Sequence, residues 1–417
     1  MRPKFEIASV LRRHWEEILC AINLNSWQRR TLNALRICRT VDLGGHIDKC
    51  GECGHLQLSY NSCRNRHCPK CQGNERDKWI AAREEELLPV KYFHVVFTIP
   101  DKLNGMCMAH PREMYNLLFQ TSWNIIKTFG EDPKHLGARN GMFAILHTWG
   151  QNLSLHPHLH CVVPAGGLTK TGKWKHARSD GKFLFPVKAM SKVFRARFVS
   201  GLRQLITEKK WNVDKSLLES LFEKPWVVFA KQPFCDTKQV VEYLGRYTHK
   251  IAISNHRISD ITNDTVSFSW KDYRHGDKKG TMTLQSMEFI RRFAMHILPK
   301  GFVRIRHFGI LSSTSKEVSI ETARKDLGVS LPSPKEIEAA VASKGSVPAL
   351  AQCPRCKKMS MARLLEFNYR GPPKDILACM LQQNAKRQSR TRNTVEAIPP
   401  MRGLTQDPKN KHKKSAK

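Results

Sequence analysis

Two histidines separated by one leucine, His158 and His160, have the residue type and spacing to bind a metal ion. Alternate side chains of a strand leave the same face, so both imidazoles can reach one ion while the leucine enters the core. Tyr243 and Tyr247 are four residues apart and would point the same way from a helix. A divalent metal beside tyrosine hydroxyls is an arrangement that cleaves nucleic acids, because the metal polarises a phosphate and a phenolate attacks it.

Each half of this arrangement has a simpler alternative. Two histidines at this spacing are often solvent-facing, and two neutral imidazoles suit Mn²⁺ or Zn²⁺ better than Mg²⁺. Tyrosines four apart often pack in a core, but Arg246 and Lys250 make this face cationic, and a nearby cation favours the phenolate. A third metal ligand is expected from a neighbouring strand. The nearest candidates are Gln151, which could also cap the turn, and His147.

The elements that must position these residues are readable from hydrophobic periodicity. His158 and His160 fall on the second of two strands joined by a short polar turn, and the tyrosines follow a plausible helix cap at Asp236-Thr237. Other strands are expected at 92–99, 142–149, 225–230, 250–254, 264–270 and 280–284. Helices are expected within 6–40, at 111–129, within 187–223 and at 286–298. Most strands lack regular crossover helices between them, which favours an α+β fold.

Cysteine pairs predict a second kind of metal site. Two C-x-x-C pairs are separated by fourteen residues, close to the four-cysteine zinc pattern, so we expect one structural zinc ion. Its predicted ligands are Cys50, Cys53, Cys68 and Cys71. Cys63, His55 and His67 lie in the same loop, so one of them could replace a cysteine, or a second ion could be present.

The remaining cysteines are harder to interpret. Cys353 and Cys356 form a lone C-x-x-C pair whose other ligands the sequence does not identify, with Cys379 and His412 as downstream candidates. The scattered cysteines, Cys38 among them, are expected to be small buried residues.

The charge of the chain favours a polyanionic partner. Its 417 residues carry 70 Lys and Arg against 36 acids, a net charge of +34, so nucleic acid is the first candidate. The cysteine loop is itself basic, and we expect Arg64 and Arg66 to contact DNA, with solvated charge as the alternative. We find no long apolar run and no signal peptide, which predicts a cytoplasmic protein without a membrane partner.

Composition also suggests the domain boundaries. We expect N-terminal helices and a zinc-binding, DNA-binding domain at 1–90, a catalytic domain at 91–315 and an extension at 316–417. The last 34 residues hold ten Lys or Arg and only two acids, which predicts a basic, disordered tail that binds nucleic acid non-specifically.

Five motifs in this order resemble the insertion-sequence-91 family of rolling-circle transposases, members of the HUH endonuclease superfamily. The resemblance extends from the N-terminus to about residue 315. The motifs are YNSCRNRHCPKCQ, FHVVFTIP, WGQNLSLHPHLHCVVPAGG, YLGRYTHKIAISNHRI and EFIRRFAMHILPKGFVRIRHFG. The resemblance implies a catalytic domain built on a central antiparallel sheet of about five strands flanked by helices. His158 and His160 would be the paired metal ligands, and Tyr243 and Tyr247 the two nucleophiles.

The resemblance also implies a function. One tyrosine would attack a single strand at an element end, assisted by Mg²⁺ or Mn²⁺, and keep the 5′-phosphate while freeing a 3′-OH. The host replication machinery would extend that 3′-OH, and the second tyrosine would cut at the other end or at the target site. A basic, aromatic segment that includes Arg304 and Arg306 is a candidate lining for single-stranded DNA. A bacterial cytoplasm, in association with the nucleoid, is the implied location, and the oligomeric state is left open.

Two other functions are compatible with these residues. A plasmid or phage replication initiator, or a relaxase, shares the metal-and-tyrosine chemistry. A zinc-containing DNA-binding regulator would bind DNA without cleaving it.

Overall fold

The structure, a computed structural model, divides into two compact units. One consists of residues 1–39 and 62–345, and the other of residues 40–61 and 346–417. The residues that the structure describes are 3–71, 87–177, 184–234, 240, 251–272, 278–329, 352–378 and 380–382.

This division differs from the three consecutive domains expected at 1–90, 91–315 and 316–417. Strand β1 (Gly45–Cys50) pairs with β13 (Met361–Phe367), more than 300 residues later. Backbone hydrogen bonds of a sheet can join segments of any separation, so composition along the chain did not reveal this pairing.

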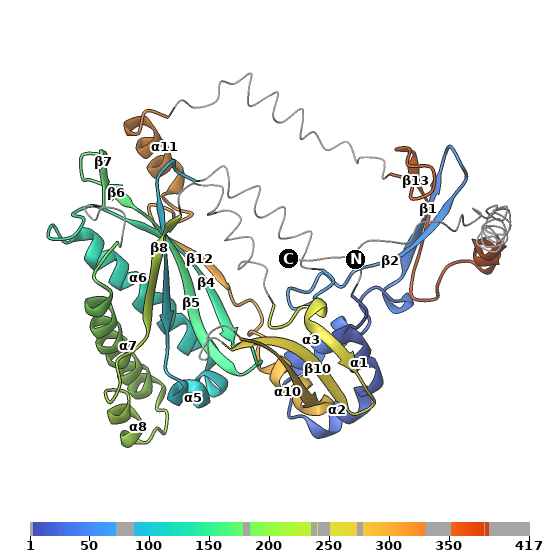
Figure 1. Cartoon of the computed structure of the whole chain (residues 1–417), viewed down its shortest axis with the longest axis horizontal. Coiled ribbons are helices and arrows are strands. Elements are labelled where there is room, and N and C mark those ends of the chain that lie inside the picture. Colours follow the sequence, from blue (N-terminus) through green and yellow to red (C-terminus); the bar gives the residue numbers. More distant parts are fainter. Residues whose placement is uncertain are drawn as a thin grey trace, which may run out of the picture. The chain divides into compact units, whose positions relative to one another are not determined.

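The larger unit is built on a five-stranded antiparallel sheet, as expected from the sequence (Figure 1). Its strands, in spatial order, are β12 (Ile305–Gly309), β4 (Gly141–Trp149), β5 (Leu155–Pro164), β3 (Tyr92–Thr98) and β8 (Val228–Phe234). Strand β5 is central and nearly all buried, because strands flank it on both sides and side chains cover both faces.

Two long helices cover one face of this sheet (Figure 1). They are α6 (Pro111–Glu131) and α7 (Val187–Lys209), with the shorter α5 (Asn104–Ala109) and α8 (Lys215–Ser220) beside them. Pro111 occupies the first turn of α6, where its missing N–H has no helical partner to lose. Phe97 and Leu159 point from the sheet into this layer, and Phe194 of α7 meets the Phe97 ring edge to face at 5.1 Å.

The opposite face of the sheet carries a separate apolar cluster. Phe143, Ile145 and Val162 of the sheet pack there with Ile320 and Ala323 of α11 (Lys316–Asp326). A small two-stranded sheet, β6 (Gly166–Leu168) and β7 (Trp174–His176), adds Leu168 and Trp174 to this cluster.

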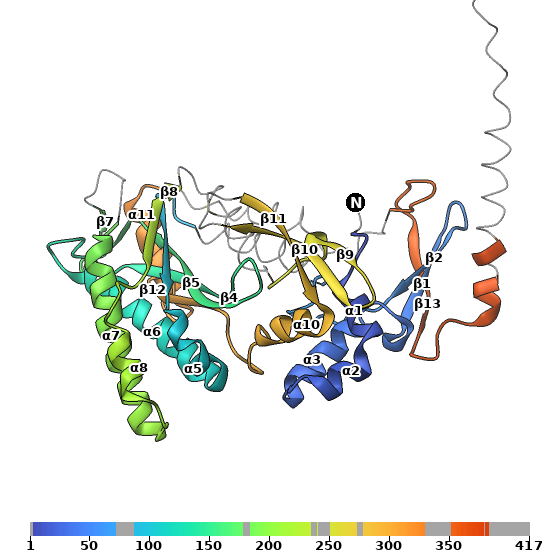
Figure 2. The same ribbon diagram turned by 60° about the horizontal axis from the view of Figure 1, so that its bottom comes forward.

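The N-terminal helices form a second layer within the larger unit. Helices α1 (Ile7–Arg13), α2 (Trp15–Ala21) and α3 (Ser26–Arg36) share a core with α10 (Ser286–Met295) and with a sheet of three strands (Figure 2). Those strands are β9 (Ile258–Ile261), β10 (Thr265–Asp272) and β11 (Lys278–Gln285). A reciprocal capping box between Asn25 and Gln28 begins α3.

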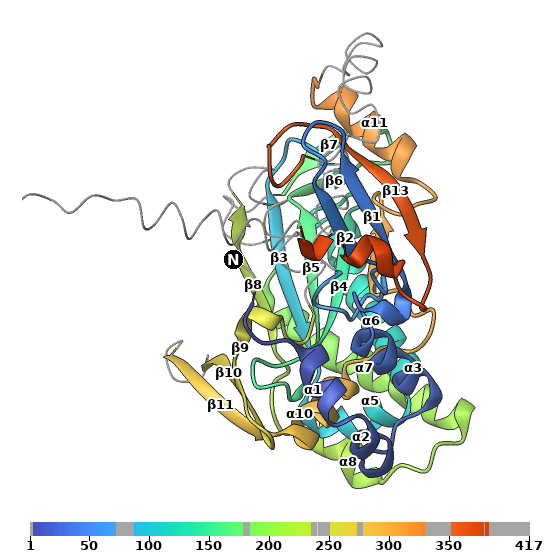
Figure 3. The same cartoon turned by 90° about the vertical axis from the view of Figure 1, so that its right-hand side faces the viewer.

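The smaller unit is a three-stranded antiparallel sheet in the order β13-β1-β2, with β2 spanning Leu56–Tyr60 (Figure 3). Tyr60 and Phe367 meet edge to face at 6.1 Å across Gly45. A Cβ on Gly45 would lie 2.3 Å from the Ser59 carbonyl oxygen and 2.6 Å from the Phe367 ring, so glycine is needed for this close approach.

Candidate active site and cysteine clusters

Three histidines from two adjacent strands gather on one face of the five-stranded sheet. His158 of β5 lies opposite His147 of β4 in the strand register, and His160 lies opposite Ile145. Residues at alternate positions share a face, so all three imidazoles lie on the face opposite α6 and α7. One ring nitrogen from each lies within 4.8 Å of the others.

The hydrogen bond of the His158 ring fixes which of its nitrogens is offered to a metal. His158 Nδ1 lies 2.6 Å from the His156 carbonyl oxygen, which can only accept, so Nδ1 carries the proton and Nε2 the lone pair. His158 Nε2 lies 3.2 Å from His160 Nε2. Two nitrogens bound to one ion at about 2.1 Å lie roughly 3.0–3.4 Å apart. The pair is therefore spaced as two ligands of a single ion.

A fourth histidine supports this group from the next strand. His94 of β3 places Nε2 2.9 Å from His160 Nδ1, and the two rings stack at 5.2 Å. Both side chains are buried. A metal-ligating histidine commonly donates its second N–H to such a partner, which fixes its tautomer and ring orientation. His94 stands in the motif FHVVFTIP but was not among the metal-site residues predicted from the sequence.

The geometry favours His147 as the third ligand. Gln151 lies in the turn after β4, where its backbone carbonyl accepts a hydrogen bond from Arg257 at 2.5 Å. The buried His147 ring instead lies 4.5 Å from the His160 ring. Three imidazoles form a donor set that suits Mn²⁺ or Zn²⁺ better than Mg²⁺.

The proposed nucleophiles Tyr243 and Tyr247, together with Arg246 and Lys250, lie outside the described residues. Val240, three residues before Tyr243, is described. It is fully buried in the cluster of Phe143, Ile145 and Val162. The described beginning of the tyrosine segment therefore packs on the face of the sheet that carries the histidines.

The structure groups the predicted zinc ligands differently from the expectation. Cys68 and Cys71 do not share a site with Cys50 and Cys53 but gather with Cys38 and Cys63. In this first cluster Cys38 Sγ lies 3.6 Å from both Cys68 Sγ and Cys71 Sγ. Zinc bound to four thiolates at about 2.3 Å places the sulfurs about 3.8 Å apart, so the cluster fits a tetrahedral site.

Two cysteines outside the predicted ligand set thus join the first cluster. Cys38 was expected to be a buried filler, but it belongs to the first cluster. Cys63 was an additional candidate, and it lies 3.7 Å from Cys71 Sγ to Sγ. Cys50 and Cys53 form a second cluster with Cys353 and Cys356.

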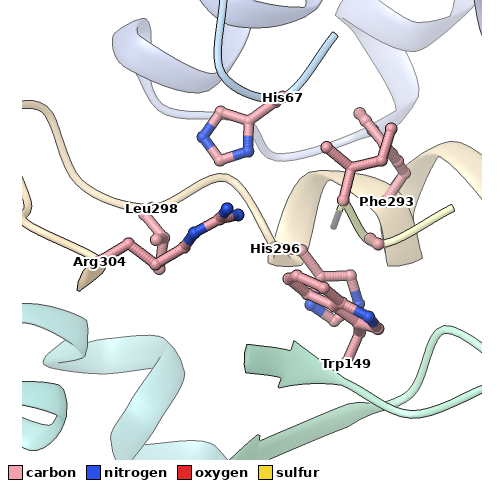
Figure 4. Close-up of a pocket in the computed structure, with 8 residues that line it drawn as sticks. His67, Trp149, Phe293, His296, Leu298 and Arg304 are labelled. Atoms are coloured by element: carbon pink, nitrogen blue, oxygen red, sulfur yellow. The ribbon is translucent and has the colours of Figure 1, made fainter. Parts of the chain in front are cut away.

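His67 lines a small cavity of about 10 Å³ beneath the cysteine loop instead of joining the sulfurs (Figure 4). The cavity also touches Trp149 at the end of β4, His296 after α10, and Arg304. Burial, with the nearby charges of Arg66 and Arg304, lowers the pKa of His67 to about 3 and keeps the ring neutral.

The arginines expected to contact DNA have different environments. Arg64 is exposed on the cysteine loop. Arg66 donates to the carbonyls of Phe302 at 2.5 Å and Pro299 at 3.2 Å, and so ties the loop to the segment before β12.

Two further arginines were expected to line a DNA groove. Arg304 is buried, unlike a residue that lines an open groove, and burial lowers its pKa to about 10. Arg306 lies with its guanidinium 4.2 Å from the Phe119 ring centroid and donates to Asn116 Oδ1 at 2.6 Å. The Arg306 side chain therefore joins β12 to α6.

Known proteins match the chain along most of its length. A family described as putative transposase matches residues 141–318, and a family described as transposase zinc-binding domain matches residues 10–99. The putative transposase y4qJ of Sinorhizobium fredii is 42% identical over 88% of this chain and 97% of its own length. The transposase for insertion sequence element IS801 of Pseudomonas savastanoi pv. phaseolicola is 29% identical over 72% of this chain and 74% of its own.

These matches define the class as a transposase with an N-terminal zinc-binding domain. The chain belongs to the insertion-sequence-91 family of transposases, as its motifs indicated. No solved structure shows a significant match. Among the helices that the structure describes, none is long and apolar enough to cross a membrane.

Proposed function

We propose that this transposase nicks and rejoins single-stranded DNA at the ends of an insertion sequence through a 5′-phosphotyrosine, and so drives rolling-circle transposition. The observation that carries the proposal is the group of His147, His158 and His160 on the sheet face where Val240 is buried, three residues before Tyr243. Both relatives named above are transposases or putative transposases.

The proposed metal site consists of His158, His160 and a third ligand, for which His147 is favoured over Gln151. A bound Mn²⁺ or Mg²⁺ would act there as a Lewis acid on the scissile phosphate. The imidazole lone pairs are already directed by the His156 carbonyl and by His94, so little reorganisation is needed on binding.

The proposed covalent step assigns the nucleophile to Tyr243 or Tyr247. The phenolic oxygen attacks phosphorus, a new O–P bond forms, and the bond from phosphorus to the 3′-oxygen breaks. The phenolic proton is lost and the leaving 3′-oxygen gains one, so the products are a 5′-phosphotyrosine and a free 3′-OH. Attack by a 3′-OH on the phosphotyrosine reverses the step and joins strands, with no need for ATP.

DNA binding would come from the basic surface. Arg64 is exposed on the cysteine loop, and Arg246 and Lys250 flank the proposed nucleophiles. Single-stranded element ends and the target site are the proposed DNA partners, and the host replication machinery would extend the freed 3′-OH. The cysteine clusters would hold zinc in a structural role.

The decisive experiment is an SDS-resistant adduct assay. Labelled single strands from both element ends are incubated with the full chain, with and without Mg²⁺ or Mn²⁺. We expect a metal-dependent adduct that is lost in Tyr243→Phe/Tyr247→Phe and in His158→Ala/His160→Ala. Tyr369→Phe and His256→Ala, a tyrosine and a histidine at exposed positions outside the proposed ligands and nucleophiles, serve as matched controls and should keep the adduct.

Two other outcomes of this assay would refute all or part of the proposed function. If the wild-type chain binds these strands but forms no adduct with either metal, the catalytic proposal fails, and a DNA-binding regulator remains. If an adduct forms at a replication origin but at neither element end, the chemistry stands and the function is that of an initiator or relaxase.

A further inference from the structure

The second cysteine cluster joins two C-x-x-C pairs that are 300 residues apart in the sequence. Cys50 Sγ lies 3.6 Å from Cys356 Sγ, and Cys53 Sγ lies 3.7 Å from Cys353 Sγ. All four sulfurs lie within 4.8 Å of one another. Four thiolates on a tetrahedral zinc ion are about 3.8 Å apart, whereas a disulfide needs about 2.05 Å. The spacing therefore fits four ligands of one ion.

The two pairs also adopt the same backbone turn. Gly54 N–H donates to the Cys50 carbonyl at 3.0 Å, and Lys357 N–H donates to the Cys353 carbonyl at 2.9 Å. Gly54 and Lys357 both have φ of +63°, a conformation that costs energy for lysine.

The next hydrogen bonds of the two turns match as well. Cys50 N–H donates to the His55 carbonyl and Cys353 N–H to the Lys358 carbonyl, each at 2.9 Å. Backbone N–H groups also approach the sulfur of the first cysteine in each pair, at 3.5 Å in one and 3.4 Å in the other. A thiolate is stabilised by such donors. Two copies of one knuckle facing each other have the form of a metal site, and chance burial of cysteines would not produce it.

The apolar cluster at the two knuckles is small. Its described core consists of Cys50, Cys353 and Met361, with Cys53 and Cys356 packed against it. A cluster made mostly of cysteine side chains contributes little hydrophobic stabilisation, so a bound ion would add substantially to the folding free energy of this region.

The surrounding charge is compatible with a zinc tetrathiolate, whose formal charge is −2. Arg355 lies within the second knuckle, and Lys357 and Lys358 follow it directly. Lys358 Nζ pairs with Glu52 Oε2 of the first knuckle at 3.0 Å. The Ser360 hydroxyl lies 2.9 Å from Cys50 Sγ and can donate to the thiolate.

We infer that the chain binds a second structural Zn²⁺ through Cys50, Cys53, Cys353 and Cys356. The match to the transposase zinc-binding domain ends at residue 99. Cys353 and Cys356, which form half of this site, therefore lie outside the matched region. The ion links β13 to β1 through its ligands. Residues 352–367 and the β1–β2 hairpin then form one zinc ribbon. This site is separate from the Cys38–Cys71 cluster and from the histidines.

The test is the zinc content of full-length variants, compared by difference so that metal on the histidines cancels. Cys353→Ser/Cys356→Ser should lose one zinc per chain, and so should Cys50→Ser/Cys53→Ser. The quadruple variant should also lose only one, because both pairs serve one ion. Cys68→Ser/Cys71→Ser should lose a different ion, so adding it to either pair should remove two. Cys20→Ser, at an exposed position outside the clusters, should lose none.

Two results would overturn the inference. One is an unchanged zinc content in Cys353→Ser/Cys356→Ser. The other is loss of only one zinc when Cys50→Ser/Cys53→Ser and Cys68→Ser/Cys71→Ser are combined, as a single four-cysteine site would give. The wild-type chain provides a test free of folding defects: ¹¹³Cd-substituted protein should show two resonances typical of all-sulfur coordination, and one such resonance would refute the second site.

Discussion

Replacing His94 tests whether the histidine group is a metal site with a supporting shell. His94 Nε2 lies 2.9 Å from His160 Nδ1, so it orients the ring whose Nε2 faces His158. His94→Leu removes that partner and leaves His160 Nδ1 without it in a buried position. Loss of such a partner typically weakens metal binding 10–100-fold, which is about 1.4–2.7 kcal/mol.

The assay is adduct formation as a function of Mn²⁺ concentration. His94→Leu should raise the Mn²⁺ concentration needed for half-maximal adduct by about 10–100-fold, while saturating metal should restore most of the rate. His94→Gln can keep a hydrogen bond to His160 and should fall between the wild type and His94→Leu. His147→Ala removes a proposed ligand itself and should not be rescued as fully.

An unchanged metal midpoint in His94→Leu, with activity lost in proportion to folded protein, would refute the reasoning. His94 would then be a buried core residue, and the 2.9 Å contact would have no role in metal binding. Circular dichroism and urea unfolding of the same samples separate these two outcomes.

Three further perturbations test the packing around the site. Burial lowers the pKa of His296 to about 4, so its ring is neutral when folded, with Nε2 donating to the Leu153 carbonyl and Nδ1 accepting from Thr148. Its contribution to stability is complete above the unfolded pKa of about 6.5 and falls by about 1.4 kcal/mol per pH unit between there and pH 4. Urea unfolding at pH 7.5 and 5.5 should show a smaller loss for His296→Gln than for the wild type, and an equal loss would contradict this. Leu159→Ala should cost about 2–5 kcal/mol in the same measurement because the side chain is fully buried. Arg66→Ala should expose the cysteine loop to limited proteolysis at lower denaturant, whereas the exposed Arg64→Ala should not.

Local sequence patterns predicted the elements that position the histidines. The expected strands at 92–99 and 142–149 are β3 and β4, and the helix expected at 111–129 is α6. The apolar residues of each element follow the spacing expected of a strand or helix that is buried on one or both faces. The strand expected at 250–254 is wrong: residues 251–254 are irregular and β9 begins at Ile258. A short apolar run can be buried by packing alone, without pairing in a sheet.

The sequence also predicted the histidine pair but not its complete environment. His147 and His94 lie on other strands, and only the register of β4, β5 and β3 places them beside His160. The motif FHVVFTIP contained a signal, because a histidine inside a strongly apolar strand must have a buried polar partner. Spacing along one strand cannot identify that partner.

The sequence did not predict which cysteines group together, because the entropy of loop closure favours near neighbours only weakly. Closing the 14-residue loop from Cys53 to Cys68 costs less chain entropy than closing the 299 residues from Cys53 to Cys353, but the difference is only about 2.7 kcal/mol. The antiparallel pairing of β1 with β13, together with the inferred zinc binding at roughly 10–16 kcal/mol, would exceed this difference. Cys38 likewise has no second cysteine near it in the sequence. It joins Cys63, Cys68 and Cys71 only in the folded chain, where the end of α3 lies beside the loop at 63–71. Proximity along the chain therefore does not identify which cysteines share a metal site. The matching backbone geometry of the two C-x-x-C turns identifies them better.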